Sequence, residues 1–167
     1  MNGYYWSPFI SNVATTSAVI NSIKSIKKFS KNKINCKILN VFKEWDYFKK
    51  EIDSYNIDLI DLKTSIDIKN LPTKGFIKSR ITYLITYVLS IVKLHLLLKK
   101  NKPEFLIIHL ITSIPLSLLI LFNYETKFIL RVSGYPKLNF WRSILWKIAN
   151  KKLYKIFCPT ILTQKLL

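Results

Sequence analysis

The sequence predicts an α/β fold in which helices cover both faces of a parallel β-sheet. Half of the 167 residues are apolar, which is enough to bury a core and too many for a disordered chain. Short apolar runs rich in β-branched residues alternate along the chain with longer segments of helical character. That alternation favours parallel strands joined by right-handed crossovers, and the length suits a single domain.

The first part of the chain is expected to supply three strands and two helices. The strands are predicted over residues 3–6, 34–42 and 57–62, and the helices over residues 14–29 and 44–55. Glu44 and Asp46 fall in the first turn of the second helix, where the helix dipole favours acidic side chains.

Two long apolar stretches follow, over residues 81–98 and 105–122, and each approaches the roughly 20 residues that a transmembrane helix needs. Pro115 interrupts the second stretch, and Ser113 is placed as a helix N-cap would be. We therefore interpret the second stretch as a strand ending at His109, a tight turn and a helix.

The first stretch is predicted to be one long helix. Its polar residues recur every three or four positions and form one stripe, made up of Thr82, Thr86, Ser90 and Lys93. We expect the helix to be buried on most other sides, because Lys93 and His95 would be costly near the centre of a bilayer. A helix that touches lipid on one side is the alternative.

With these stretches interpreted, the second part of the chain continues the alternation. Its helices are predicted over residues 75–100, 115–122 and 140–149, and its strands over residues 104–109, 127–133 and 155–158.

Ligands of parallel α/β sheets bind beyond the carboxyl ends of the strands, so the residues that follow each strand are the candidates. The loop after the first strand offers hydroxyl and amide groups and opens a helix, which suits a phosphate or sugar hydroxyls. These groups belong to Ser11, Asn12, Thr15 and Thr16. Simple helix capping is the alternative for each of them. The loop has no G-x-G-x-x-G pattern, so a dinucleotide site is not expected.

Two further strand ends carry candidates. His109 closes the fourth strand, where a histidine could hydrogen-bond a sugar hydroxyl or phosphate; a satisfied core histidine is the alternative. Arg131 closes the fifth strand and could bind a phosphate, and Gly134 permits a positive φ in the loop that follows. A Gly-Pro turn flanked by solvated bases is the alternative there.

Other kinds of site are disfavoured. The strand ends show no paired carboxylates, no Ser/His/Asp set and no cluster of metal ligands, so neither a metal nor a cofactor is expected. Cys36 and Cys158 have no partner motif and are expected to be buried thiols in a reducing compartment. The N-terminal residues lack the pattern of a signal peptide, which favours the cytoplasm.

The charge is concentrated in the second part of the chain. The formal charge is +18, and residues 68–167 contribute fourteen lysines and three arginines against two acids. Three explanations remain open: a lysine-rich composition typical of AT-rich genomes, an anionic membrane or phosphate surface, and nucleic acid. The last is disfavoured, because only three arginines are available for bidentate contacts to bases.

Four segments, taken in order, resemble the N-terminal domain of family-4 glycosyltransferases of the GT-B type. They are YYWSPFISNVATTSAVINSI, LLLKKNKPEFLIIHLITSIPLSLL, KFILRVSGYPKLNFWRSILWK and KIFCPTILTQ, and they cover nearly the whole chain. Two departures are visible. The Gly-Gly common in the family's first loop is replaced by the residues from Asn12 to Thr15, and the usual aspartate after the proline is Glu104.

The resemblance implies a Rossmann-like half of a GT-B fold and a role for each candidate. His109 would contact the transferred sugar or the acceptor, and Arg131 and Gly134 would border the acceptor pocket. The loop residues Ser11, Asn12, Thr15 and Thr16 would line the cleft between the two halves of the enzyme.

The resemblance also implies an activity. The whole protein would transfer a sugar, with retention and without a metal, from a nucleotide-sugar to a lipid-linked or polysaccharide acceptor. The product would be a cell-envelope glycan such as lipopolysaccharide. The family binds its donor in a second domain, so residues 1–167 are expected to be the acceptor-side half, inactive without a C-terminal domain or partner subunit. We expect it in the cytoplasm, peripheral to the plasma membrane, with an anionic membrane surface and not nucleic acid as a further partner.

Two other classes compete with this interpretation. One is a small basic integral membrane protein with transmembrane helices over residues 81–98 and 105–122. The other is a basic module that binds nucleic acid.

Overall fold

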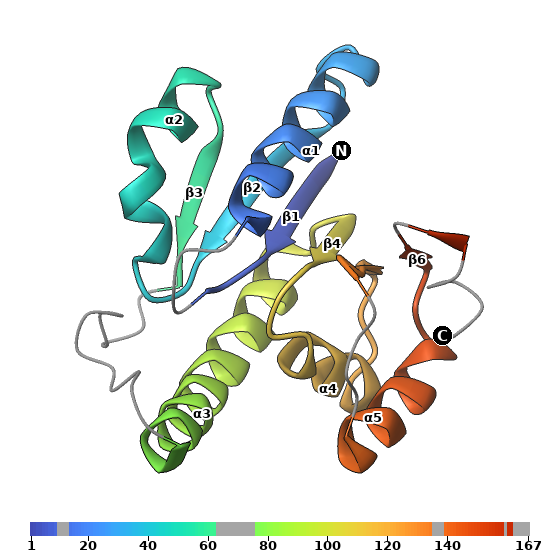
Figure 1. Ribbon diagram of the computed structural model, residues 1–167. Coiled ribbons are helices and arrows are strands. Elements are labelled where there is room, and N and C mark those ends of the chain that lie inside the picture. The colour runs from blue at the N-terminus through green and yellow to red at the C-terminus, as the bar shows by residue number, and fades with distance from the viewer. Residues whose placement is uncertain (10–13, 63–75, 135–138, 159, 162–167) are drawn as a thin grey trace.

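The computed structural model describes residues 1–9, 14–62, 76–134, 139–158 and 160–161. It contains six parallel strands in the order β3-β2-β1-β4-β5-β6, with helices on both faces of the sheet (Figure 1). This arrangement confirms the predicted α/β fold. The strands are β1 (Asn2–Trp6), β2 (Asn35–Asn40), β3 (Asp58–Asp61), β4 (Phe105–Ile108), β5 (Lys127–Arg131) and β6 (Lys155–Phe157).

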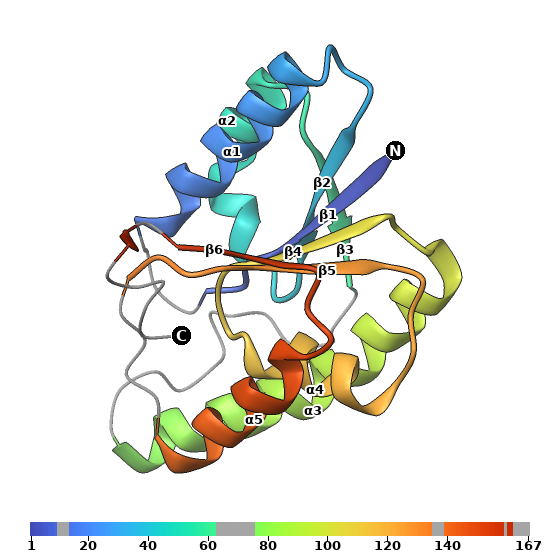
Figure 2. The same ribbon diagram turned by 90° about the vertical axis from the view of Figure 1, so that its right-hand side faces the viewer.

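The helices divide into two layers, which Figure 2 shows on opposite sides of the sheet. Helix α1 (Thr15–Phe29), the 3-10 helix η1 (Glu44–Phe48) and α2 (Lys49–Ser54) form one layer. Helices α3 (Phe76–Asn101), α4 (Ser113–Leu121) and α5 (Phe140–Asn150) form the other. The layers follow from right-handed crossovers, which place the helices of the first three strands on one face and the later helices on the other.

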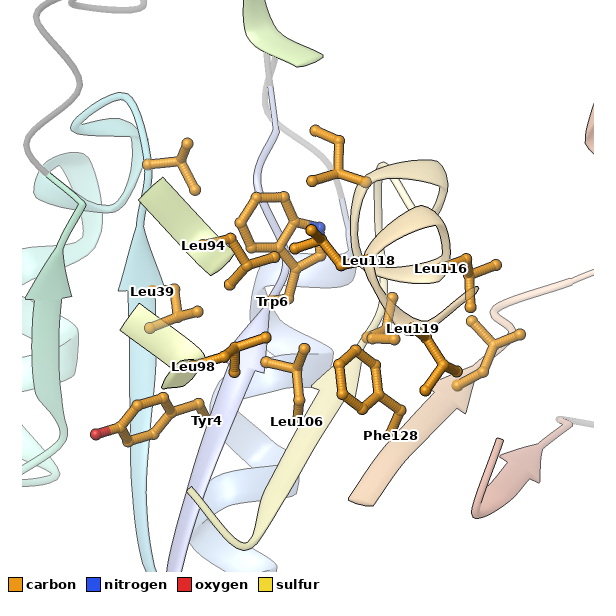
Figure 3. Close-up of a cluster of buried hydrophobic side chains, with 14 of the residues drawn as sticks. Tyr4, Trp6, Leu39, Leu94, Leu98, Leu106, Leu116, Leu118, Leu119 and Phe128 are labelled. Carbon is orange, nitrogen blue, oxygen red and sulfur yellow. The ribbon is translucent and has the colours of Figure 1, made fainter. Parts of the chain in front are cut away.

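Alternation along the strands divides the core in two. On β1, Tyr5 faces α1 and joins a cluster that includes Ile20 and Ile38, all at most 1% exposed. Its neighbours Tyr4 and Trp6 point to the other face and pack with leucines of α3 and α4 (Figure 3).

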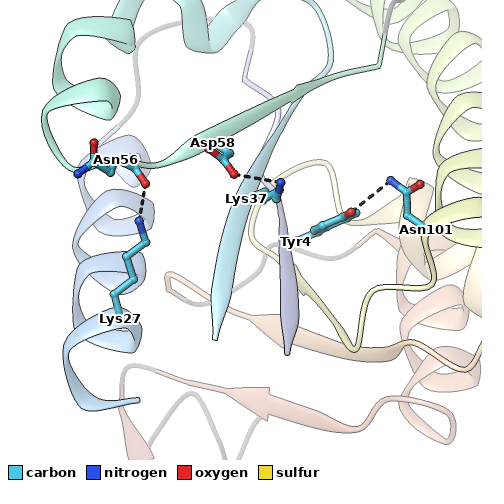
Figure 4. Close-up of polar contacts among 6 residues, drawn as sticks. All are labelled: Tyr4, Lys27, Lys37, Asn56, Asp58 and Asn101. Atoms are coloured by element: carbon cyan, nitrogen blue, oxygen red, sulfur yellow. Dashed lines mark hydrogen bonds and ion pairs between the residues drawn. The ribbon is translucent and has the colours of Figure 1, made fainter. Parts of the chain in front are cut away.

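Polar contacts along the sheet support this packing (Figure 4). Lys37 of β2 pairs with Asp58 of β3 at 3.0 Å, directly across the two strands. Asn101, at the end of α3, donates its side-chain amide to the Tyr4 hydroxyl at 3.2 Å. Lys27 of α1 donates to the carbonyl oxygen of Asn56, which ties α1 to the turn before β3.

The predicted helix over residues 44–55 is wrong in its first half, which is a 3-10 helix. Glu44 and Asp46 do fall in the first turn of this helix, as predicted, but Glu44 has a further role. It is fully buried, and its carboxylate accepts the backbone N–H groups of Val41 and Phe42. Lys43 takes a left-handed conformation with φ of 61°, so the chain turns sharply before the helix begins.

The apolar stretch over residues 105–122 divides into β4 and α4, as Pro115 predicted. The predicted N-cap is wrong by one residue, because Thr112 is the cap and Ser113 is the first residue of α4. Pro115 is then the third helical residue, where its missing N–H breaks no helical hydrogen bond. Within the described residues, no helix has both the length and the apolar character that crossing a bilayer requires.

Helix α3 differs from the prediction in its exposure. Ser90 is completely buried and Lys93 is exposed, so these two members of the predicted polar stripe do not share an exposed face. The side chains of Thr82 and Thr86 lie outside the described residues. The exposed apolar positions of α3 lie along one side of the helix, so the expected burial does not extend to that side. Among the cysteines, Cys36 is buried as predicted, whereas Cys158 is only half-buried.

Candidate functional site

The carboxyl ends of β1, β4 and β5 meet at one edge of the sheet. The backbone N–H of His109 donates to the carbonyl oxygen of Trp6 at 2.9 Å, which extends the Trp6–Ile108 register by one step. Continuing the alternation places the His109 side chain on the α1 side of the sheet, where its ring lies 5.7 Å from that of Tyr5. His109 is therefore held at the end of the strand, as predicted from its position.

The imidazole of His109 is buried and makes no hydrogen bond in the described part of the chain. The residue is 5% exposed, and neither ring nitrogen has a hydrogen-bond partner among the described residues. Burial, together with a smaller contribution from the nearby charge of Arg131, lowers the pKa of His109 to about 4. At neutral pH the ring is neutral, with one nitrogen as donor and the other as acceptor. A sugar hydroxyl, which both donates and accepts, matches this pair of groups.

Two hydroxyl groups near the same strand ends are also without partners. Ser7 follows β1 and is 1% exposed, and Thr112 follows β4 and is 9% exposed. Neither side-chain oxygen has a hydrogen-bond partner within the described part of the chain. Leaving a buried polar group unpaired costs about 1–3 kcal/mol, so such groups are rare and call for an explanation. Buried atoms without a partner among the described residues also occur away from these strand ends, in Trp45, Ser90 and Trp146. It is therefore the position of Ser7 and Thr112 at the same strand ends as His109 that makes them candidates for contact with a ligand.

Backbone strain occurs in the loop between His109 and α4. Ile111 has a φ of 44°, a left-handed conformation that a β-branched residue avoids. Its carbonyl oxygen accepts a hydrogen bond from the indole N–H of Trp6 at 3.2 Å, which helps to hold the loop. Strain of this kind costs about 1–3 kcal/mol and occurs preferentially at functional sites.

Arg131, the last residue of β5, connects the site to a cavity on the α1 side of the sheet. Its guanidinium donates to the carbonyl oxygen of Ala18 in α1 at 3.5 Å. The cavity has a volume of about 700 Å³ and lies between α1 and the strands β1, β4, β5 and β6. Ile107 and Ile129 contribute apolar surface to its lining, and Arg131 contributes a positive charge.

Tyr5 also lines the cavity, and sequence reasoning missed it. Burial raises the pKa of Tyr5 above its ordinary range, while its hydrogen bond to Ser22 and the charge of Arg131 act in the opposite direction. The two hydroxyl oxygens are 2.8 Å apart. Tyr5 and Arg131 each interact with His109, so the three residues form one group at the strand ends. Tyr5 precedes the strand end by one residue, and no motif marks it.

The remaining predicted site residues lie in α1, in the loop after β5 or outside the described residues. Thr15 and Thr16 lie in the first turn of α1, with Thr15 half-buried and Thr16 buried. Ser11 and Asn12 lie outside the described residues. Gly134 does not take the positive φ that glycine would permit, and a side chain there would meet nothing within 4 Å. Its conformational freedom is therefore not used. Within the described ranges, no three His, Cys, Asp or Glu residues lie close enough to hold a metal ion.

No family model and no curated protein matches this sequence. Solved structures do resemble the fold. UDP-GlcNAc 2-epimerase from Neisseria meningitidis, bound to UDP-GlcNAc, matches 98% of the chain with a TM-score of 0.59 and 13% identity. The glycosyltransferase of kitacinnamycin matches 90% of it, with a TM-score of 0.52 and 9% identity. CalG4, the calicheamicin glycosyltransferase, matches 99% of it, with a TM-score of 0.50 and 12% identity.

The chain spans only part of each of these proteins: 41% of the epimerase and 34% and 40% of the two glycosyltransferases. At such low identity the likeness shows the fold alone. The fold is that of a Rossmann-like half of a GT-B enzyme, as the sequence predicted.

Proposed function

We propose that residues 1–167 are the N-terminal, acceptor-side half of a family-4-like glycosyltransferase. The whole protein would move a hexose, with retention of configuration, from a nucleotide-sugar to a lipid-linked or polysaccharide acceptor. The acceptor would belong to a cell-envelope glycan such as lipopolysaccharide, and the protein would act at the inner face of the plasma membrane. The observation that supports this most is the buried, neutral imidazole of His109 at the carboxyl edge of the sheet, which makes no hydrogen bond to any described residue.

In this proposal His109 positions the reacting sugars. Its neutral ring would donate one hydrogen bond and accept another from hydroxyl groups of the transferred sugar or the acceptor. The hydroxyls of Ser7 and Thr112, unpartnered within the described residues, would extend the same polar lining. Bringing two sugars into a fixed geometry accelerates transfer even without proton exchange with the protein.

Arg131 would supply the positive charge of the site. Its guanidinium stands between α1 and β5 and lines the cavity. A phosphate of a lipid-linked acceptor would find a charged, planar donor there. Ser11, Asn12, Thr15 and Thr16 would line the cleft on the α1 side, and Gly134 would border the acceptor pocket.

The nucleotide-sugar would be held mainly by a second domain or a partner subunit, so this chain alone should not transfer sugar. The first experiment is therefore to express the gene together with all of its downstream coding sequence. Transfer from radiolabelled nucleotide-sugars to lipid-extracted acceptors would then be measured with and without the segment after residue 167. A longer protein that converts UDP-GlcNAc without any acceptor would contradict the proposal and favour an epimerase.

The second experiment tests the site. In the active protein, His109→Ala should lower transfer about 100-fold, because it removes a preorganised hydrogen-bonding group from a buried site. The thermal midpoint should fall only by the amount that a small cavity explains, since His109 makes no side-chain hydrogen bond within the described residues but is buried beside Tyr5.

His95→Ala is the matched control. His95 lies on α3, and its Nδ1 is 2.7 Å from the Tyr124 hydroxyl, away from the strand ends. Its removal should leave transfer near normal. Equal losses for the two histidine variants, or normal transfer by His109→Ala, would refute the role of His109.

A further inference from the structure

One face of α3 is an exposed apolar stripe. Five large apolar residues recur at intervals of three or four along the helix and are 49–62% exposed: Ile81, Leu84, Val88, Val92 and Leu96. This spacing places them in a line on one side of the helix. Leu94 and Leu98, on the opposite side, are buried against Leu106 of the sheet. The stripe therefore faces away from the core.

Helix α5 carries a second exposed apolar surface. Phe140 and Trp141 are 72% and 76% exposed at its start, and Ile144 and Ile148 continue along the helix. Helices α3, α4 and α5 form one layer, and α4 contacts both of its neighbours (Figure 2). Isolated apolar residues are common on protein surfaces, but two apolar stripes in one layer mark an interaction site.

The charge of this layer is entirely of one sign. Helices α3, α4 and α5 contain no aspartate or glutamate, and they contain seven lysines and arginines. The other layer is of mixed sign, because its helices α1, η1 and α2 hold four acids and five lysines. Lys93, Lys147 and Lys151 are exposed among the apolar residues of α3 and α5.

We propose that the α3–α5 layer is a docking surface for an anionic lipid bilayer, on which α3 and α5 lie in the plane of the interface. Exposed Leu, Val, Phe and Trp residues would enter the boundary of the acyl chains, and the lysines would meet lipid phosphates. A protein partner is a poorer match, because lysine is depleted at protein interfaces. This proposal rests on the membrane location proposed above, but the surface needs no sugar donor, so a failure to bind vesicles would leave the transferase activity untouched.

Vesicle binding tests the proposal directly. The 167-residue chain would be sedimented with vesicles of phosphatidylcholine alone and with vesicles of phosphatidylcholine and phosphatidylglycerol in equal parts. We expect it to sediment with the anionic vesicles and not with the neutral ones, and high salt should weaken the binding. The emission of Trp141 should shift to the blue on binding, and Trp141→Phe should remove most of that shift.

Paired variants locate the surface. The double variant Val88→Ser with Val92→Ser should weaken vesicle binding about tenfold or more, because both side chains are exposed and apolar. Phe29→Ser is the matched control, since Phe29 is 81% exposed but lies at the end of α1. Circular dichroism would confirm that each variant is folded.

A charge pair completes the test. Lys147→Glu with Lys151→Glu should weaken binding to anionic vesicles, whereas Lys49→Glu with Lys50→Glu on α2 should not. The proposal is overturned if both of these double variants weaken binding equally, or if the unchanged chain does not bind anionic vesicles. It is also overturned if the chain forms a dimer that the Val88 and Val92 changes dissociate, because the stripe would then bind a second copy.

Discussion

Two clusters of buried polar groups, at the ends of β2 and β4, differ in whether the groups have hydrogen-bond partners. The indole N–H of Trp45 near β2 is an exception, since it is also unpartnered among the described residues. At the end of β2, the side chain of Asn40 donates to Asp46 and Asp61 at 2.8 Å each and accepts the backbone N–H of Trp45. Glu44 accepts two backbone N–H groups nearby. At the end of β4, the side chains of His109 and Thr112 have no hydrogen-bond partner among the described residues.

The difference separates structure from function. A buried polar group that is fully partnered fixes a turn, and its removal should cost stability. A buried polar group without a partner costs stability in the free protein and gains its partner only when something binds. The polar groups at the end of β2 therefore stabilise the turn that follows it, whereas those at the end of β4 are suited to binding a ligand.

The largest predicted effect concerns the pH dependence of the free energy of unfolding. His109 and Glu44 contribute to it with opposite sign. The pKa of His109 is lowered from 6.5 to about 4, so its contribution to stability is present above pH 6.5 and is lost as the pH falls towards 4. The pKa of Glu44 is raised from 4.5 to about 7, because burial outweighs its backbone hydrogen bonds. Its contribution is present below pH 4.5 and is lost as the pH rises through 7.

Each contribution amounts to about 3 kcal/mol, and they oppose each other in the parent. Relative to the parent, His109→Leu should therefore become more stable as the pH is lowered from 7 to 4, and Glu44→Gln should become less stable. Urea denaturation at a series of pH values measures both. Parallel curves for the parent and His109→Leu would show that His109 does not titrate in this range.

The next effect concerns the partnered cluster. Glu44→Gln should lower the free energy of unfolding by about 2 kcal/mol at neutral pH, because the new amide group would face the N–H of Val41 or Phe42. Glu51→Gln, on the exposed surface of α2, is the control and should change little. A neutral result for Glu44→Gln would mean that the turn after β2 holds without the carboxylate.

The smallest effect concerns the unpartnered cluster. Thr112→Val keeps the shape of the side chain and removes its unpaired hydroxyl, so it should raise the free energy of unfolding by about 1 kcal/mol. Ser22→Ala, which removes a hydroxyl bonded to Tyr5, should lower it by a similar amount. If both variants lose stability, the hydroxyl of Thr112 has a partner in solution and the contrast between the clusters disappears.

The sequence predicted the order and type of the elements because local signals were strong. Pro115 divided an apolar stretch correctly into β4 and α4. The η1 segment was missed, because the burial of Glu44 depends on contacts with Val41 and Phe42 that no helical pattern reveals. The apolar face of α3 was missed for a related reason. Periodicity identifies the sides of a helix, but the neighbours decide which side is covered.

The site was predicted in part. The rule that ligands bind at strand ends selected His109 and Arg131, which interact with each other in the structure. The same rule would have selected Ser7, had its burial been known. Ile111 could not have been predicted, because its strained backbone depends on the path of the loop and on its bond to Trp6.

The central position of β1 also has a consequence for synthesis of the protein. Its two neighbours are β2, which is made soon after it, and β4, in which Phe105 lies opposite Gly3. While the ribosome makes the chain between them, one edge of β1 has no strand to pair with, and Tyr4 and Trp6 lack the leucines that cover them. Such non-local pairing is slow and leaves the nascent chain exposed to aggregation. We therefore expect the nascent chain to depend most on chaperones during the time when β1 has been made and β4 has not.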